Sequence, residues 1–326
     1  MKPSFFKKLG PIKTNSIKDI IGCDLHNINN NDEYNELVSL SNAKSSKDLT
    51  FIYDNENFIP NLLNKPSIIC TSKKYLELKN KFKLIIVKDV QKSVSILSNK
   101  FYRDFTNEEI SNFRKPTIGE GSKISKNAII ENGASIGKNV TIQDGACIKN
   151  GTIIGDNSYI DYNSVISNSI FGENVFIGRN CSIGQQGFGF SIYPKKNIKI
   201  FHIGRVIIQA NVNIGSNCSI DRGSFGDTII GENTFLDNLC HIAHNVVIGS
   251  NCVFAAMTGI AGSAKIGDYV LAGGQAGIAG HISVGNNVKI AAKSAVFNSL
   301  NDGETVMGNP AISKFKYIKR YKKTYG

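Results

Sequence analysis

The feature that most constrains this chain is a repeat of one apolar residue at every sixth position. Isoleucine stands at each sixth position from Ile118 to Ile166. The spacing is interrupted over 184–205, breaks a second time before Ile230, and ends at Val296. An internal repeat of this length predicts a repetitive architecture for most of the chain, so it has to be interpreted before any single motif.

The six-residue spacing excludes an amphipathic helix and favours short strands joined by corners. Six is not a multiple of 3.6, so a helix would distribute these residues around its surface instead of keeping them on one face. One apolar anchor per six residues suits a parallel β-helix, in which each anchor points into a narrow interior. If three hexapeptides form one triangular coil, residues 18 apart stack at the interstrand distance of about 4.8 Å.

The repeat divides the chain into three expected parts. Residues 1–112 lack the repeat and contain probable strands alternating with helical segments, which predicts a small α/β domain. The expected strands are Leu49–Tyr53, Ser67–Cys70 and Leu84–Val87, and the expected helices are 74–81 and 90–97. Residues 113–310 form the β-helix, and residues 311–326 form a short basic C-terminal helix or tail. The fold class is therefore mainly β.

Composition identifies a globular protein with an excess of positive charge. Hydrophobic residues make up 41% and charged residues 20%, which excludes general disorder and collagen-like or coiled-coil folds. The net charge of +12 favours an acidic partner such as nucleic acid, anionic lipid or an acidic carrier protein, without selecting one. Seven cysteines without a C-x-x-C pair, together with an N-terminus that lacks an apolar signal region, predict a cytoplasmic protein that does not span the membrane.

Three histidines fall within the regular repeat and are the main candidates for chemistry. His241 and His244 flank the anchor Ile242, so both are expected outside the interior. One coil of 18 residues leads from His244 to Gly262, and 19 more lead to His281, so these residues could line one edge. An imidazole base beside a glycine N–H suits acyl transfer, in which an amine attacks a thioester. No Gly-x-Ser-x-Gly elbow and no P-loop are present.

Zinc binding is the rival use of histidines on such a scaffold. The β-helical carbonic anhydrases carry a histidine pair five residues apart and a third histidine about two coils earlier. Here His241 and His244 are three residues apart, and no histidine follows His281. We therefore expect no metal site.

An ordered series of motifs over about 110 residues closely resembles the UDP-3-O-acylglucosamine N-acyltransferases of lipid A synthesis. The segments that carry the resemblance are Gly187–Phe190, His202–Ile208, Ile220–Gly223, Asp227–Gly231, Leu236–Asn238, Ile242–Val246 and Ile278–His281. Hexapeptide repeats alone would be weak evidence, because acetyltransferases, pyrophosphorylase domains and anhydrases share them. The resemblance implies a left-handed β-helix assembled as a homotrimer, with active sites between subunits.

The resemblance also implies roles for residues in the repeat. His244 matches the general base, Gly262 the oxyanion donor, and His281 a second histidine that positions the thioester. Asp237 and Asn245 resemble residues around the sugar and the base, although Asp and Asn are also favoured at β-helix corners for conformational reasons.

Two further regions of this family bind other parts of the substrates. In the N-terminal domain, Phe51, Asn55 and Phe58 are the candidates for uridine binding, and the alternative is that the aromatic residues are core residues at a strand end. Ala295 stands where some members place a methionine that closes the acyl groove, so the groove is expected to be open here unless Phe297 fills it. The segment 184–205 resembles a loop over a neighbouring subunit's cleft.

The activity implied by the resemblance is transfer of a 3-hydroxyacyl group to the 2-amino group of UDP-3-O-acylglucosamine. The donor is acyl carrier protein, whose phosphopantetheine carries the acyl group, so no separate cofactor is expected. Carrier protein is acidic, which makes the net charge and the basic tail a plausible docking surface. We expect a homotrimer, no nucleic-acid partner and at most peripheral association with a membrane. Three alternatives remain, namely an acetyl-CoA-dependent nucleotide-sugar N-acetyltransferase, a zinc hydratase and a non-catalytic binding module.

Overall fold

The structure is a computed structural model that describes residues 5–54, 65–192 and 196–325, and it divides into two compact units. The β-helix unit contains 106–187 and 204–326, and the α/β unit contains 6–105 and 188–203. The two units divide before residue 106, so residues 106–112 belong to the β-helix unit. The reason is α4 (Asn107–Ser111), a helix with a capping box between Thr106 and Glu109, whose last carbonyl accepts a hydrogen bond from Asn132 of the β-helix at 3.0 Å.

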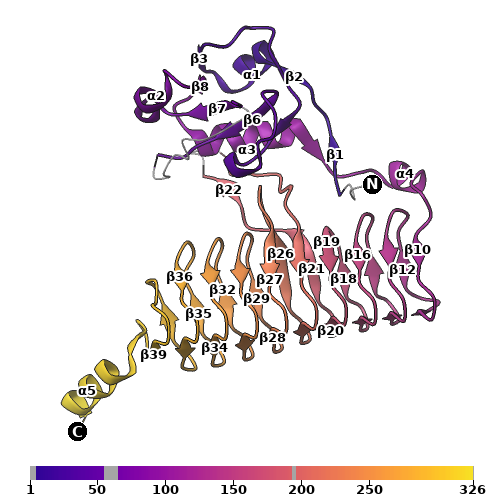
Figure 1. Cartoon of the computed structure of the whole chain (residues 1–326), viewed down its shortest axis with the longest axis vertical. Coiled ribbons are helices and arrows are strands. Elements are labelled where there is room, and N and C mark those ends of the chain that lie inside the picture. Colours follow the sequence, from indigo (N-terminus) through magenta and orange to yellow (C-terminus); the bar gives the residue numbers. More distant parts are fainter. Residues whose placement is uncertain (1–4, 55–64, 193–195, 326) are drawn as a thin grey trace. The chain divides into compact units, whose positions relative to one another are not determined.

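The β-helix unit consists of three parallel sheets, each built from one short strand per coil (Figure 1). The first sheet contains β10 (Thr117–Ile118), β13 (Ser135–Ile136), β16 (Ile153–Ile154), β19 (Ser169–Phe171), β24 (Val206–Ile208), β27 (Thr228–Ile230), β30 (Val247–Ile248), β33 (Lys265–Ile266) and β36 (Ser283–Val284). The second contains β11 (Lys123–Ile124), β14 (Thr141–Ile142), β17 (Tyr159–Ile160), β20 (Phe176–Ile177), β25 (Asn213–Ile214), β28 (Phe235–Leu236), β31 (Val253–Phe254), β34 (Leu271–Ala272), β37 (Lys289–Ile290), β39 (Thr305–Met307) and the antiparallel β40 (Ile312–Ser313). The third contains β12 (Ile129–Ile130), β15 (Cys147–Ile148), β18 (Val165–Ile166), β21 (Ser182–Gln186), β26 (Ser219–Arg222), β29 (His241–Ile242), β32 (Gly259–Ile260), β35 (Gly277–Ile278) and β38 (Ala295–Val296).

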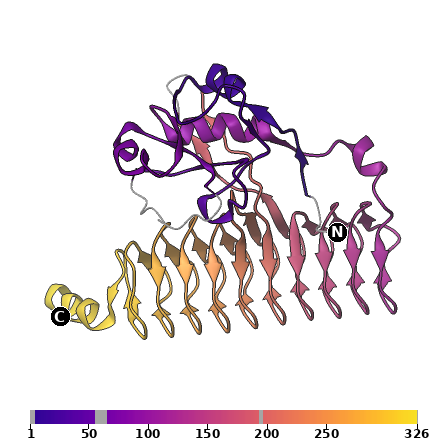
Figure 2. The same cartoon turned by 45° about the horizontal axis from the view of Figure 1, so that its top comes forward.

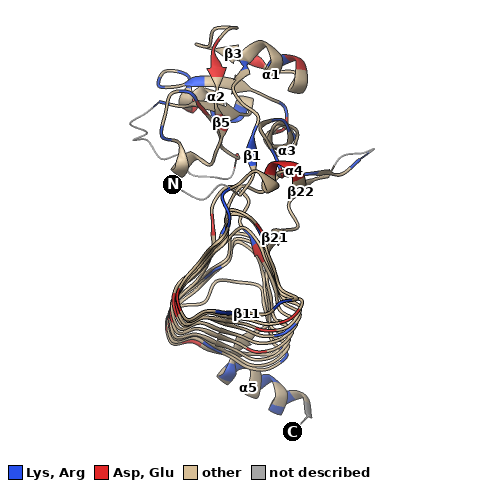
Figure 3. Cartoon of the chain, turned by 90° about the vertical axis from the view of Figure 1, so that its right-hand side faces the viewer, with Lys and Arg blue, Asp and Glu red and all other residues tan. Residues whose placement is uncertain are grey.

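The register of these strands confirms the expected stacking of residues 18 apart. Ile118 pairs with Ile136, and Ile260 pairs with Ile278. Viewed along the stack, the coils superpose as a triangle (Figure 3). The fold is a left-handed parallel β-helix made of hexapeptide repeats. The six-residue period predicted the parallel β-helix, and the family resemblance implied its hand.

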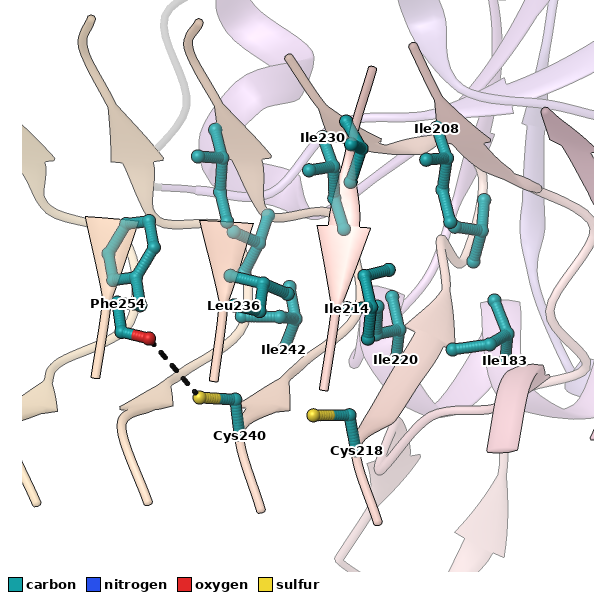
Figure 4. Close-up of a cluster of buried hydrophobic side chains, with 14 of the residues drawn as sticks. Ile183, Ile208, Ile214, Cys218, Ile220, Ile230, Leu236, Cys240, Ile242 and Phe254 are labelled. Atoms are coloured by element: carbon teal, nitrogen blue, oxygen red, sulfur yellow. Dashed lines mark hydrogen bonds between the residues drawn. The ribbon is translucent and has the colours of Figure 1, made fainter. Parts of the chain in front are cut away.

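The anchor residues fill the interior of the triangle (Figure 4). Ile220, Ile242 and Phe254 are buried, whereas the strand residues that precede them are half-buried or exposed, namely Ser219, His241 and Val253. Because each anchor stacks on the anchors of the coils above and below, the core is continuous along the β-helix. Truncating one such isoleucine to alanine typically costs about 2–5 kcal/mol of folding free energy.

The corners depend on residues that tolerate a positive φ. Asn233 and Asn251 occupy equivalent corners with φ values of 55° and 59°. Asparagine is favoured there because its short polar side chain reduces the cost of the left-handed conformation. The Asn233 amide donates a hydrogen bond to the Asn251 side-chain oxygen at 2.7 Å, so the same residues also link adjacent coils.

The α/β unit is a small domain around a five-stranded sheet of order β3-β8-β7-β6-β5. The sheet strands are β3 (Asp24–His26), β5 (Glu36–Leu37), β6 (Asp48–Phe51), β7 (Ser67–Cys70) and β8 (Lys83–Ile86), and all neighbours except β3 and β8 are parallel. The helices are α1 (Thr14–Ile21), η1 (Leu40–Asn42), α2 (Ser72–Leu78) and α3 (Val90–Phe101). Two small antiparallel pairs complete it, namely β1 (Lys7–Lys8) with β9 (Tyr102–Arg103) and β2 (Ile12–Lys13) with β4 (Glu33–Tyr34). The expected strands and helices of this region are thus present.

The segment that interrupts the repeat joins the α/β unit. It contains the hairpin strands β22 (Phe190–Ser191) and β23 (Ile198–Lys199). The side chains of Gln91 and Asn99 in α3 donate hydrogen bonds to the backbone carbonyls of Phe190 and Lys199, both at 2.8 Å. The segment is therefore held by α3 of its own chain, and coverage of a neighbouring subunit's cleft stays a prediction.

The β-helix unit ends in α5 (Lys314–Tyr325), which follows β40 (Figure 2). Within the ranges that the structure describes, no helix combines the length and the apolar content needed to cross a membrane.

Candidate active site

The two neighbouring histidines lie at the third sheet, outside the β-helix interior. Ile242 of β29 is fully buried, whereas His241 is exposed and His244 is half-buried at the corner that follows the strand. The alternation of a strand sends Ile242 inward and His241 outward, as the position of the anchor predicted.

His244 lies directly against Gly262 of the next coil. A Cβ atom at Gly262 would lie 3.0 Å from both Nε2 and Cε1 of the His244 ring. Such contacts are closer than ordinary van der Waals packing, so a side chain at this position would displace the imidazole. Glycine therefore allows the ring to approach the backbone of the adjacent coil, as the spacing of 18 predicted.

Asn245 determines which nitrogen of His244 carries a proton. Its side-chain oxygen accepts hydrogen bonds from the Ser224 backbone N–H at 2.9 Å and the Ser224 hydroxyl at 2.8 Å, while its Nδ2 donates to the Gly226 carbonyl at 3.1 Å. This network fixes the orientation of the carboxamide, and its oxygen lies 3.1 Å from Nδ1 of His244. Because an amide oxygen only accepts, Nδ1 must be the donor, and the lone pair of the neutral ring lies on Nε2. The structure thus gives Asn245 contacts with the base.

The loop that holds Asn245 was missed as a functional element in the sequence. The apolar anchors Ile220 and Ile230 are ten residues apart instead of six, and the additional residues form the turn that supplies Ser224 and Gly226. The break in spacing was visible, but a break alone does not say which side chain the inserted turn will contact.

A buried carboxylate beside the histidines was also not assigned a role. Asp221 is 5% exposed, and its Oδ1 accepts a hydrogen bond from Nε2 of Gln185 at 2.7 Å. Its Oδ2 lies 3.9 Å from Nε2 of His241. Burial raises the pKa of the Asp221 carboxyl, and the charges of His241 and His244 and the bond from Gln185 act in the opposite direction. The motif Ile220–Gly223 contained this residue, but only folding reveals that it is buried beside imidazoles.

His281 occupies a different corner position from His244. It has φ of 59°, the same left-handed conformation as Asn245 and Ser263, and these three residues are spaced by 18. Its backbone N–H donates to the Gly262 carbonyl at 3.1 Å, and its side chain is exposed. The structure therefore places His281 one coil beyond Gly262 on the same edge, with its side chain open to a ligand.

On the outer face of the third sheet, the coils that follow His241 carry small residues. His241, Gly259, Gly277 and Ala295 are successive partners in the strand register. A Cβ at either glycine would meet no atom within 4 Å, so this face is open. Two residues further along the same strands stand Ala261, Ala279 and Phe297, and Phe297 is 58% exposed. The result is a smooth strip that ends at Ala295 and Phe297.

The remaining predicted residues are Asp237 in the β-helix unit and Phe51, Asn55 and Phe58 in the N-terminal part of the chain. Asp237 lies at the corner before β29, where its carboxylate accepts hydrogen bonds from the backbone N–H groups of Asn238 at 2.7 Å and Ala256 at 3.1 Å. These bonds stabilise the corner, and a contact of Asp237 with the sugar stays a prediction. Phe51 is buried at the end of β6 with its ring 5.5 Å from that of Tyr53. Asn55 and Phe58 lie outside the described residues.

The described part of the chain contains no group of three or more His, Cys, Asp or Glu side chains arranged to hold a metal ion. The seven cysteines are free thiols, and Cys218 in the interior donates its S–H to the Asp237 carbonyl at 3.2 Å.

Comparisons with known proteins agree with this architecture. The family profile "Bacterial transferase hexapeptide (six repeats)" matches residues 227–262, "Hexapeptide repeat of succinyl-transferase" matches 263–296, and "GMPPB C-terminal domain" matches 114–200. No curated protein sequence matches the chain significantly.

Among solved structures, a UDP-N-acetylglucosamine acyltransferase from Campylobacter jejuni is 26% identical, with a TM-score of 0.54, over 63% of this chain and 79% of that protein. A UDP-N-acetylglucosamine O-acyltransferase from Moraxella catarrhalis is 23% identical, with a TM-score of 0.47, over 61% of this chain and 76% of that protein. The profile matches and the Campylobacter similarity show that the β-helix unit resembles hexapeptide-repeat acyltransferases.

Proposed function

We propose that this hexapeptide-repeat acyltransferase transfers a 3-hydroxyacyl group from acyl carrier protein to the 2-amino group of a UDP-3-O-acylglucosamine. The observation that carries the proposal is the pairing of His244 with Gly262. Asn245 leaves the ring's lone pair on Nε2, and this atom faces the backbone of Gly262. When an amine attacks a thioester, the amine nitrogen must lose a proton and the carbonyl oxygen becomes negative. A base can accept that proton, and a backbone N–H beside it can stabilise the oxygen.

In the proposed reaction the amine nitrogen attacks the thioester carbonyl carbon and forms a C–N bond. His244 Nε2 accepts the proton that the nitrogen loses, while the N–H of Gly262 stabilises the negative oxygen of the tetrahedral intermediate. The C–S bond then breaks, and the proton passes from His244 to the departing thiolate of the phosphopantetheine. His281 would position the thioester, since its exposed side chain lies one coil further along the same edge.

The strip of small residues supports an acyl-chain site beside this centre. Gly259 and Gly277 leave the outer face of the sheet without side chains, so an extended hydrocarbon could lie flat along successive strands. The strip continues to Ala295, where a methyl group leaves more room than a longer side chain would. A buried methylene contributes about 0.8 kcal/mol, so the end of the strip would set the preferred chain length.

The remaining parts of the proposal concern assembly, location and the nucleotide. We expect a homotrimer in the cytoplasm, with no cofactor beyond the phosphopantetheine of the carrier. Outward residues of the first sheet support self-association, because Ile207, Ile229 and Val247 form an apolar column that the β-helix itself covers only in part. The uridine would bind to the α/β unit near Phe51, with Asn55 and Phe58 as further candidates.

The decisive experiment offers the purified chain a matrix of donors and acceptors. Donors are 3-hydroxyacyl carrier proteins of several chain lengths, the corresponding CoA thioesters and acetyl-CoA. Acceptors are UDP-3-O-acylglucosamine and UDP-N-acetylglucosamine. We expect amide product only with carrier protein and the amine acceptor. Turnover with acetyl-CoA in place of carrier protein would support the N-acetyltransferase alternative instead.

A second candidate is O-acylation of UDP-N-acetylglucosamine, and the similarity to the Campylobacter acyltransferase favours it. The same base could remove a proton from a hydroxyl group. Mild alkali distinguishes the products, because it hydrolyses an ester and leaves an amide intact.

A further inference from the structure

The C-terminal helix α5, for which the sequence suggested docking of the acidic carrier protein, carries a concentration of positive charge that takes no part in the chemical step. Its 12 residues include Lys314, Lys316, Lys319, Arg320, Lys322 and Lys323, and no acidic residue. These residues are exposed, and Figure 3 shows blue along the helix without red.

The helix is amphipathic as well as basic. At 100° per residue, Lys316, Lys319, Arg320 and Lys323 fall on one face, and the opposite face carries Tyr317, Ile318 and Tyr321. Lys314 lies among these apolar residues, and Phe315 and Lys322 lie between the two faces. Phe315 is 79%, Ile318 40% and Tyr321 57% exposed. Three large apolar side chains of this short helix are thus exposed, although transfer of each from water to an apolar environment would lower the free energy.

One edge of this apolar face is attached to the β-helix unit. A Cβ at Gly308 would lie 2.6 Å from Cε2 of Tyr317, so the Tyr317 ring packs on the bare backbone of the turn. Gly308 also has φ of 97°, which side-chain-bearing residues avoid. The contact holds the start of the helix and leaves the outer apolar residues exposed.

We propose that α5 binds lengthwise to the surface of a membrane that contains anionic lipid. Its apolar side chains would enter the boundary between head groups and acyl chains, and its lysines would extend to the phosphates. Charge complementarity alone would also fit an acidic protein. An acidic protein that bound the cationic face, however, would leave the apolar residues Ile318 and Tyr321 on the opposite face outside the contact, whereas a lipid surface accommodates both faces at once.

The proposal goes beyond the acyl-transfer reaction and is tested without it. The full-length chain is sedimented with phosphatidylcholine vesicles prepared with and without phosphatidylglycerol, at low and high salt. We expect binding only to the anionic vesicles, with weaker binding at high salt.

Two variants separate the contributions of charge and apolar area. Replacing the four residues Lys316, Lys319, Arg320 and Lys323 by glutamine should weaken partitioning about five-fold per charge. The double variant Phe315→Ser and Ile318→Ser keeps every charge and should weaken it at least about ten-fold. The matched control removes the same number of exposed charges from the β-helix by glutamine substitution at Lys123, Lys126, Lys138 and Lys265, and should bind as wild type does.

Three results would overturn the proposal. The first is equal binding to both kinds of vesicle, and the second is loss of binding in the control variant. The third is unchanged binding after Phe315→Ser and Ile318→Ser. If that double variant instead lost affinity for acyl carrier protein or changed its mass in solution, the helix would be a docking site for the carrier or for a second copy. All of these measurements are independent of turnover, so a failure here does not bear on the proposed reaction.

Discussion

In the candidate site, hydrogen bonds fix the orientation of individual side chains. Asn245 is oriented by Ser224 and Gly226, and His244 is oriented by Asn245. A neutral amide thus performs the orienting task that a carboxylate performs in many histidine-based sites. Predictions at this scale therefore concern single residues.

Replacing His244 with alanine should lower kcat by at least about 100-fold, the lower range for loss of a general base. The side chain is half-buried and outside the hydrophobic core, so thermal stability should change little. The matched variant His241→Ala removes an imidazole three residues away and should retain more activity. A folded His244→Ala enzyme with normal kcat would refute the assignment.

The variant Asn245→Gly should lower kcat about ten-fold with little change in KM, because the imidazole would lose its fixed tautomer and not its substrate contacts. Glycine accepts the φ of 62° found here, so the corner should remain intact. Asn251→Gly, at a corner with φ of 59°, is the control and should leave kcat unchanged. Equal loss in both variants would indicate a merely structural role.

Asp221 links the site to stability. Folding raises the pKa of the Asp221 carboxyl above 3.8, its value in the unfolded chain. The free energy of unfolding therefore decreases as pH rises above 3.8, because the folded protein resists loss of this proton. Asp221→Asn should therefore raise the free energy of unfolding at neutral pH, and this gain should shrink as pH falls and vanish below about pH 3.8. Urea unfolding at several pH values measures this change in the free energy of unfolding, and Asp19→Asn, at an exposed residue of α1, is the control. A gain independent of pH would contradict this explanation.

Among the elements, the third sheet combines structural regularity with a variable outer surface. Inward positions carry the anchors, while the outward positions of β32 and β35 carry glycine and that of β38 carries alanine. Since anchors alone maintain the coil, the outer positions are available for binding a ligand.

Substitutions on this face should change the preferred acyl length. Ala295→Met should reduce activity selectively toward the longest accepted donor. Gly277→Leu should reduce the preferred acyl-chain length further, because the leucine side chain would enter the open strip nearer to the histidines. Ser283→Leu, outward on β36 of the first sheet, is the control. The measurement is kcat/KM over a series of chain lengths. An unchanged profile in both strip variants would mean that the acyl chain lies elsewhere.

At the scale of the whole molecule, the β-helix has flat outer faces that suit assembly. We expect sedimentation equilibrium to give about three times the chain mass of 35.5 kDa. A monomer at micromolar concentration would contradict the proposed trimer and any active site shared between subunits.

The sequence by itself determined the β-helix, because a period of six with apolar anchors has one compact solution, and the strand register followed from it. It also predicted that His244 and Gly262 would meet, since stacking at 18 residues is a property of the repeat. The tertiary structure decided what lies where the period fails. The hydrogen bonds from α3 to Phe190 and Lys199 and the turn that orients Asn245 depend on contacts between residues distant in sequence. The burial of Asp221 likewise depends on neighbouring coils, so no local pattern encodes it.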